Sequence, residues 1–195
     1  MRTFKLLLVL CGLLLFATQV HAIPVTLDPT TDILPYDWTI NGNDHSTNVI
    51  RGLVAPYIGT AESLYKANFG GVEEGDLWDN YTTVFSNTST NPRNALISHD
   101  GGANIGPVAW LIVKDGDAVP NWYLYNLTDL GWTGTETITL QNFFIDNPLT
   151  SDNDGGSISH VELLGTTAPV PEPATMLLFG AGLIGLAGFR RKFKK

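Results

Sequence analysis

Short runs of apolar and β-branched residues alternate with turn-forming residues along most of the chain, and no segment shows a convincing helical repeat. The runs are rich in Thr, Val, Ile and aromatic residues, and Gly, Asn, Asp or Pro separate them. This pattern is typical of β-strands joined by tight turns. The predicted strands are YDWTI (36–40), SLYKANF (63–69), YTTVF (81–85), NALIS (94–98), VAWLIVK (108–114), WYLYNL (122–127), ETITLQNFF (136–144) and SISHVELL (157–164).

Two of these runs indicate how their strands lie in a sheet. In ETITLQ, Ile138 and Leu140 point to one face, and the neighbouring threonines point to the other, because side chains alternate along a strand. The run at 108–114 is apolar on both faces, as expected of an interior strand. About eight short strands at this spacing predict an all-β fold, a single β-sandwich similar to a jelly roll.

This β-sandwich is expected to occupy residues 23–165, followed by a short linker at 166–170. The stretch TLDPTTDILP (26–35) is either a flexible arm or an edge strand. Between residues 23 and 170 there are four cations and eighteen acidic residues, a formal net charge of −14. Nucleic acid and anionic lipid are therefore not expected as partners, because both would be repelled.

The N-terminus has the three parts of a secretory signal peptide, predicted over residues 1–22. Arg2 and Lys5 precede an apolar run at 6–17, and VHA ends at the expected signal peptidase site, Ala22. The apolar run is too short to span a bilayer. Cleavage would remove the chain's single cysteine, Cys11, so the exported domain would contain no disulfide.

The C-terminus combines an extended Pro-Glu-Pro, an uncharged segment and a basic tail. Residues 174–189 carry no charge and would form a helix about 24 Å long, just under the roughly 30 Å hydrocarbon core. The tail at 190–195 would remain cytoplasmic by the positive-inside rule. The precursor is thus expected to be anchored in the inner membrane through this helix, with its domain facing the periplasm.

This ending, with Pro171-Glu172-Pro173 before the span and Arg190-Arg191 after it, resembles the PEP-CTERM sorting signal of bacterial exported proteins. The resemblance implies that exosortase recognises residues 171–195, removes the anchor and passes the domain to the cell surface or extracellular matrix. It also implies a bacterium that makes exopolysaccharide, which becomes a candidate partner. Residues 110–165 are similar to an ectodomain type that recurs before this signal and has no role that could be transferred.

Candidate metal ligands occur in one acidic loop. Asp146, Asp152 and Asp154 lie in DNPLTSDNDGG, and hard oxygen ligands on a tight turn suit calcium. The twelve-residue spacing of an EF-hand is missing, and loops of this composition are also ordinary hairpin turns. Calcium is therefore a candidate cofactor without a complete motif.

Catalytic motifs are not found. The pairs Ser98-His99 and Ser159-His160 are not expected to act as nucleophile and base, because neighbours on a strand point to opposite faces. The histidines are instead expected to be hydrogen-bonded on a sheet face. Glycosidases use two carboxylates about 5 to 10 Å apart. Among eighteen acidic residues some pair would have this separation by chance, so such a pair would be weak evidence for a glycosidase.

The five tryptophans give some support for sugar binding. Trp78 and Trp132 lie in polar, Gly-flanked contexts and are candidate exposed platforms for stacking on sugar rings, whereas Trp110 is expected to be buried. The alternative is that these tryptophans fill the core. The sequence predicts an exported, exosortase-sorted, non-enzymatic protein with a structural or adhesive role and contact with a glycan. The alternative is a secreted carbohydrate-active enzyme with the same tag.

Overall fold

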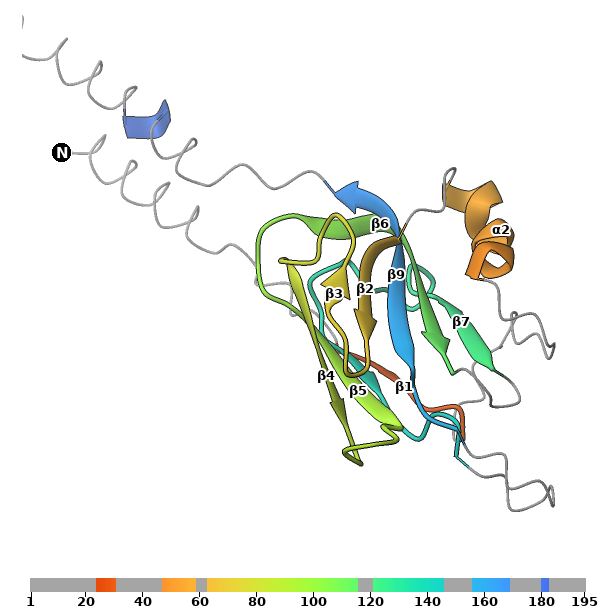
Figure 1. The fold of residues 1–195 in the computed structure, drawn as a ribbon. Coiled ribbons are helices and arrows are strands. Elements are labelled where there is room, and N and C mark those ends of the chain that lie inside the picture. The colour runs from red at the N-terminus through yellow and green to blue at the C-terminus, as the bar shows by residue number, and fades with distance from the viewer. Residues whose placement is uncertain are drawn as a thin grey trace, which may run out of the picture.

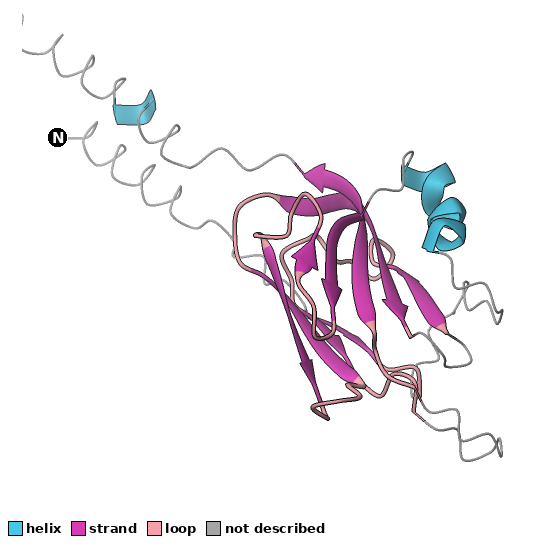
Figure 2. Cartoon of the chain, in the orientation of Figure 1, coloured by secondary structure: helices cyan, strands magenta, loops and turns pink. Residues whose placement is uncertain are grey.

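The computed structural model describes residues 24–30, 47–58, 63–115, 121–145, 156–168 and 180–182. Two β-sheets make up most of this part of the chain (Figures 1 and 2). A five-stranded sheet has the order β3-β2-β9-β6-β7, and a four-stranded sheet has the order β1-β8-β5-β4. The prediction of an all-β fold is therefore confirmed.

The strands of the five-stranded sheet are β2 (Ser63–Asn68), β3 (Glu73–Glu74), β6 (Asn104–Lys114), β7 (Trp122–Asn126) and β9 (His160–Ala168). Those of the four-stranded sheet are β1 (Val25–Leu27), β4 (Tyr81–Ser86), β5 (Asn94–His99) and β8 (Ile138–Leu140). Seven of the predicted strands correspond to β2 and to β4–β9, whereas the run at 36–40 lies outside the described residues. β1 is an edge strand and includes the first two residues of the stretch at 26–35, for which the sequence allows either an arm or an edge strand.

One hydrophobic core lies between the two sheets and a second lies outside the five-stranded sheet. Ile138 and Leu140 of β8 are fully buried in the first core, as their alternation predicts. On β9, Val161 and Leu163 face this core, whereas Leu164 belongs to the second core. β6 contributes to both cores and lies between β9 and β7, which confirms the prediction of an interior strand.

The second core is covered by helix α2 (Thr47–Ile58), which the sequence analysis did not predict. Ile50 and Val54 of this helix are buried against Trp110 and Ile112 of β6. Apolar residues at 50, 53, 54 and 58 do follow a helical spacing. Gly52 and Pro56, both unfavourable inside helices, obscured this signal.

The strand topology differs from a jelly roll. β1 and β8 pair in parallel, whereas a jelly roll is antiparallel throughout. In addition, β2–β3, β4–β5 and β6–β7 are hairpins, each within one sheet. The jelly-roll part of the prediction is therefore wrong, although two sheets do enclose a common core.

Two tyrosines join the sheets through their hydroxyl groups. Tyr65 of β2 donates to Glu73 Oε1 at 2.8 Å and lies 2.7 Å from Thr83 Oγ1 on β4. Tyr81 of β4 donates to the carbonyl of Gly134 at 2.7 Å and accepts from the amide of Ile105 at 2.9 Å. Burial raises the pKa of Tyr81 to about 12, so its hydroxyl keeps its proton at neutral pH.

Among the residues that the structure describes, none of the helices is long and apolar enough to cross a membrane. The anchor predicted at 174–189 lies outside these residues except for one helical turn at 180–182.

Replacing Gly134 by alanine is expected to destabilise the fold strongly. Gly134 has φ +103°, and an added Cβ would collide with the carbonyl oxygen of Ile105. Gly101→Ala is the matched control, because Gly101 has φ +114° but nothing lies within 4 Å of an added Cβ. The free energy of unfolding, measured in urea, should fall by about 2 kcal/mol more for Gly134→Ala than for Gly101→Ala. Equal losses would contradict this packing.

Candidate functional site

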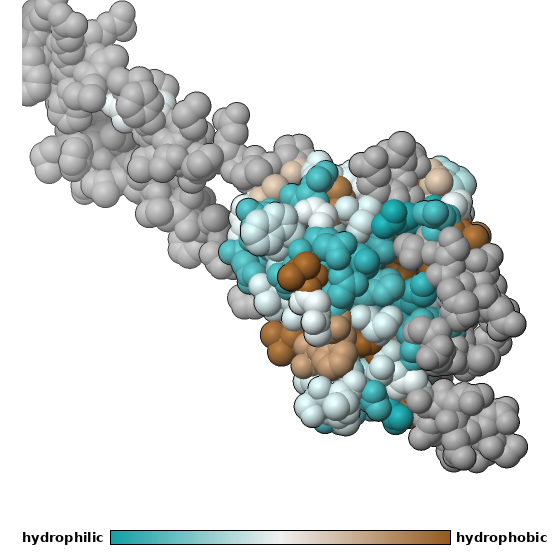
Figure 3. Space-filling view, viewed as in Figure 1, coloured by the Kyte–Doolittle hydropathy of each residue, from teal (hydrophilic) through white to brown (hydrophobic). Residues whose placement is uncertain are grey.

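The outer face of the five-stranded sheet, which is the face turned away from the other sheet, has an apolar half and a polar half. Helix α2 covers the apolar half over β6 and β7. The polar half lies over β9, β2 and β3, and Figure 3 shows hydrophilic side chains gathered there in the centre of the view. We call the charged and imidazole groups in this half, together with Arg51 of α2 and Lys114 at the end of β6, the polar cluster: Arg51, Lys66, Glu74, Lys114, His160 and Glu162.

Strand register brings the members of the polar cluster together. Lys66 pairs with Glu74 on one side and with Glu162 on the other. His160 pairs with Lys114 across the β9–β6 ladder. Residues separated by up to about a hundred positions in sequence therefore lie on neighbouring strands, on one face.

Glu162 is the buried anion at the centre of the cluster. Its side chain has no exposed area, and its Oε1 accepts from Arg51 Nη2 at 2.5 Å and from Arg51 Nε at 2.9 Å. Both guanidinium nitrogens thus bind the same oxygen. The other oxygen, Oε2, is buried and has no hydrogen-bond partner in the described structure.

Lys66 and Glu74 form a looser pair at the edge of the cluster. Lys66 Nζ lies 3.8 Å from Glu74 Oε2, and the two side chains are 27% and 53% exposed. Glu74 Oε1 also accepts from Asn68 Nδ2 at 2.9 Å. An exposed ion pair at this distance contributes little to stability, so Lys66 can exchange its partner at low cost.

His160 is neutral and has one ring nitrogen in use. Its Nδ1 lies 3.3 Å from Ser159 Oγ, and that hydroxyl donates to the carbonyl of Lys114 at 2.9 Å. Because a hydroxyl has a single proton, this network assigns the ring proton to Nδ1 and leaves Nε2 as an acceptor. Nε2 is buried without a hydrogen-bond partner in the described structure.

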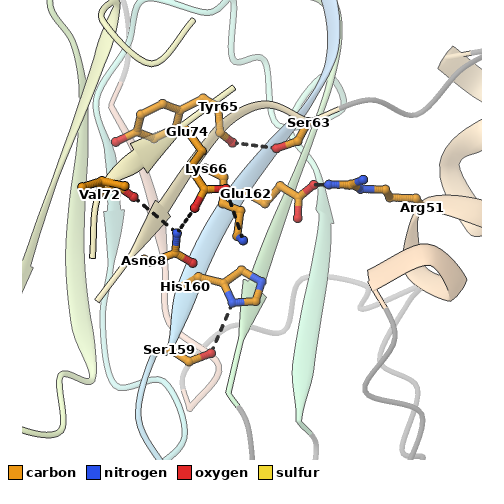
Figure 4. A network of polar contacts seen from close by, with 10 residues as sticks. All are labelled: Arg51, Ser63, Tyr65, Lys66, Asn68, Val72, Glu74, Ser159, His160 and Glu162. Atoms are coloured by element: carbon orange, nitrogen blue, oxygen red, sulfur yellow. Dashed lines mark hydrogen bonds and ion pairs between the residues drawn. The ribbon is translucent and has the colours of Figure 1, made fainter. Parts of the chain in front are cut away.

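Burial, followed by the positive charges of Lys66, Lys114 and Arg51, lowers the pKa of His160 to about 4. Three of the four cations between residues 23 and 170 therefore act on this one imidazole. The site combines positive charge with two unpartnered acceptors (Figure 4). Such a set suits an anionic or hydroxylated ligand, whereas a metal ion would be repelled. No group of three or more metal-binding side chains occurs among the described residues.

Ser159 and His160 correct one expectation. Strand alternation predicts that the two side chains point to opposite faces, but they lie in hydrogen-bond contact. Ser159 precedes β9, so the alternation of a regular strand does not apply to it. Its hydroxyl proton is directed at Lys114, which leaves none to give to His160 as a nucleophile would. His99 meets its expectation: Nε2 lies 3.3 Å from the carbonyl of Ala103.

The candidate tryptophan platforms have different outcomes. Trp78 is 57% exposed, as expected, but Trp132 is only 4% exposed, so the expectation that it is exposed is wrong. Its Nε1 donates to the carbonyl of Glu136 at 2.7 Å, while the Glu136 carboxylate binds Thr133. This tight turn folds the indole into the core. Trp110 is buried, as predicted.

A shallow depression of about 560 Å³ lies beside the end of β9, and its lining includes Pro107, Trp132 and Ala168. Among the described residues that line it, none is acidic, basic or a histidine, so these residues supply no acid–base pair.

Several predicted residues lie outside the described residues. These are the candidate calcium ligands Asp146, Asp152 and Asp154, the cleavage-site residue Ala22, and the sorting residues Pro171, Glu172, Pro173, Arg190 and Arg191. Their roles remain predictions. The polar cluster, in contrast, was missed by sequence reasoning, although a lone Glu162 in the apolar run HVELL was a signal for it.

The lowered pKa of His160 predicts a loss of stability in acid. The unfolded chain takes up a proton near pH 6.5 and the folded chain only near pH 4, so stability falls as the pH drops through this window. The difference should be on the order of 2 kcal/mol relative to His160→Asn, measured by urea denaturation at pH 7 and pH 4. If the His160 ring titrated near pH 6.5 in NMR spectra of the folded protein, the burial of its neutral form would be refuted.

Comparison with known families matched the end of the chain that follows β9. Residues 169–192 match the family described as the PEP-CTERM protein-sorting motif. No curated protein matched the chain, and no solved structure matched it either. The motif starts at the residue after Ala168, where β9 ends. The chain is therefore a protein with a PEP-CTERM sorting signal, which implies export and processing by an exosortase.

Proposed function

We propose that the protein is a non-enzymatic component of the cell surface or extracellular matrix, sorted there by exosortase, with a structural or adhesive role and contact with a glycan. The observation that carries this proposal is the PEP-CTERM motif at residues 169–192. The precursor would enter the periplasm through its signal peptide and be held in the inner membrane by residues 174–189. Removal of this anchor would then release the two-sheet domain outward.

The junction between the domain and the motif supports processing close to folded structure. β9 pairs with β2 on one side and β6 on the other, and only Pro169 and Val170 separate its last residue from Pro171. Three extended residues span about 10 Å. An enzyme that binds the Pro-Glu-Pro segment therefore has the folded domain as a near neighbour. The two prolines would favour an extended segment, which a processing enzyme could bind.

Contact with a glycan is supported by surface chemistry. Trp78 offers an exposed aromatic face, which can stack on a sugar ring. The polar cluster adds a hydrogen-bond donor at the partly exposed Lys66 and two buried acceptors without partners in the described structure. Together these features favour binding over catalysis, because no step of bond cleavage is needed to account for them.

The proposal is tested by the intact mass of the protein recovered from cells with and without exosortase. The expected mature chain lacks residues 1–22 and the tail beyond Pro171-Glu172-Pro173, and the second loss should require exosortase. A variant with Pro171→Ala and Pro173→Ala should keep its tail, whereas the control Thr167→Ala, an exposed residue before the matched motif, should be processed normally. A chain that ends at Lys195 with and without exosortase would contradict sorting and leave a permanently anchored surface domain.

A further inference from the structure

We infer that the polar cluster is a binding site for a polyhydroxy acid, such as an acidic sugar that carries a carboxylate next to hydroxyl groups. This inference deepens the proposed contact with a glycan, and so it rests on that part of the proposed function. Its physical basis is a pair of buried acceptors that lack partners, set among cations.

The two acceptors are on the same side of the sheet. Glu162 and His160 are two residues apart on β9, so both side chains lie on the outer face. In Figure 4 the free carboxylate oxygen of Glu162 and the Nε2 atom of His160 point toward the same space beside Arg51. Because Glu162 is fully buried, an oxygen without a hydrogen-bond partner there lowers the stability of the fold.

Two neighbouring acceptors need donors from a ligand. Glu162 Oε2 can only accept from a ligand while Arg51 holds the other oxygen, and the hydrogen-bond network leaves His160 Nε2 as an acceptor as well. A sugar hydroxyl supplies such a proton, and its oxygen can in turn accept from a lysine or arginine. A simple carboxylate has no proton to offer at neutral pH. These acceptors therefore select for hydroxyl groups.

The surrounding cations select for a negative charge elsewhere in the same ligand. The positive charges of Lys66, Lys114 and Arg51 all disfavour protonation of His160. Among them, Lys66 is the cation best able to bind a ligand, because its contact with Glu74 is 3.8 Å long and Glu74 also has Asn68 as a partner. A ligand carboxylate at Lys66 would form a shorter, charge-assisted hydrogen bond.

Both requirements are met by a molecule with a carboxylate and adjacent hydroxyls. The remainder of the domain is strongly acidic, with a net charge of −14 between residues 23 and 170, so an anionic sugar is attracted at this cluster and repelled elsewhere. The predicted pose places the carboxylate at Lys66, one hydroxyl as a donor to Glu162 Oε2 and an adjacent hydroxyl as a donor to His160 Nε2.

The test is an NMR titration of the full-length chain in detergent, so that its result does not depend on sorting. The probes are D-glucuronate, D-glucose, which lacks the carboxylate, and propionate, which lacks the hydroxyls. Glucuronate is expected to bind with a dissociation constant on the order of 1 mM and to shift the His160 ring resonances. Glucose and propionate should bind at least about tenfold more weakly, because each meets one of the two requirements.

Variants separate this site from other surfaces. Lys66→Met changes a partly exposed side chain and should weaken glucuronate binding about tenfold while the fold is kept. Arg93→Met removes the one remaining cation between residues 23 and 170, which precedes β5 in the other sheet, and should leave binding unchanged. Glu162→Gln should abolish the preference for glucuronate over propionate.

Three results would overturn the inference: no binding of glucuronate, equal binding of glucuronate and propionate, or equal weakening by Lys66→Met and Arg93→Met. Failure of this titration would leave the mass measurement of sorting untouched. Conversely, a chain that is never processed could still bind glucuronate. The two proposals therefore fail separately.

Discussion

The arrangement of the outer face depends on one buried carboxylate. Glu162 lies in β9, which has neighbours on both sides, and its side chain has no contact with solvent. A buried charge in this position destabilises the fold unless an opposite charge binds it. Removing one partner of a buried ion pair lowers the free energy of unfolding by about 3–5 kcal/mol. Arg51 is that partner, and it comes from α2. The helix therefore has a charged contact with the sheet in addition to its apolar one.

This contact explains why the outer face has two unlike halves. With Arg51 tied to β9, the apolar residues of α2 cover β6 and β7, and the strands on the other side of β9 keep polar side chains. Lys66 and Glu74 occupy this open half. His160 lies between the two halves, where burial and nearby cations keep it neutral. Positive charge is thereby concentrated at one place on an otherwise acidic domain.

The strands could be predicted from the sequence because their signal is local. Alternation in ETITLQ and the apolar run at 108–114 report burial on one face or on both, and the structure agrees at each. The helix was missed because Gly52 and Pro56 interrupt a spacing that is otherwise helical. Burial of Trp132 was missed because the turn that encloses it is held by Glu136, and a polar, glycine-rich sequence does not reveal such a turn.

The polar cluster could not be assembled from the sequence, because strand register determines it. Lys66 and Glu162 become neighbours only when β2 pairs with β9, and Arg51 joins them only when α2 docks on the sheet. Periodicity predicts which face a residue occupies but not which distant residue lies beside it. The sorting signal is the opposite case. Its three parts are contiguous in sequence, so the pattern alone identified it before the family comparison matched it.

The central claim is that the Arg51–Glu162 pair holds α2 on the sheet. Hydrogen–deuterium exchange of the wild type and of Arg51→Met tests this claim directly. The account predicts that the α2 amides of the variant exchange at least about tenfold faster, while the β4 and β5 amides in the other sheet keep their protection. Unchanged protection of α2 in the variant would show that apolar packing alone positions the helix, and the claim would be wrong.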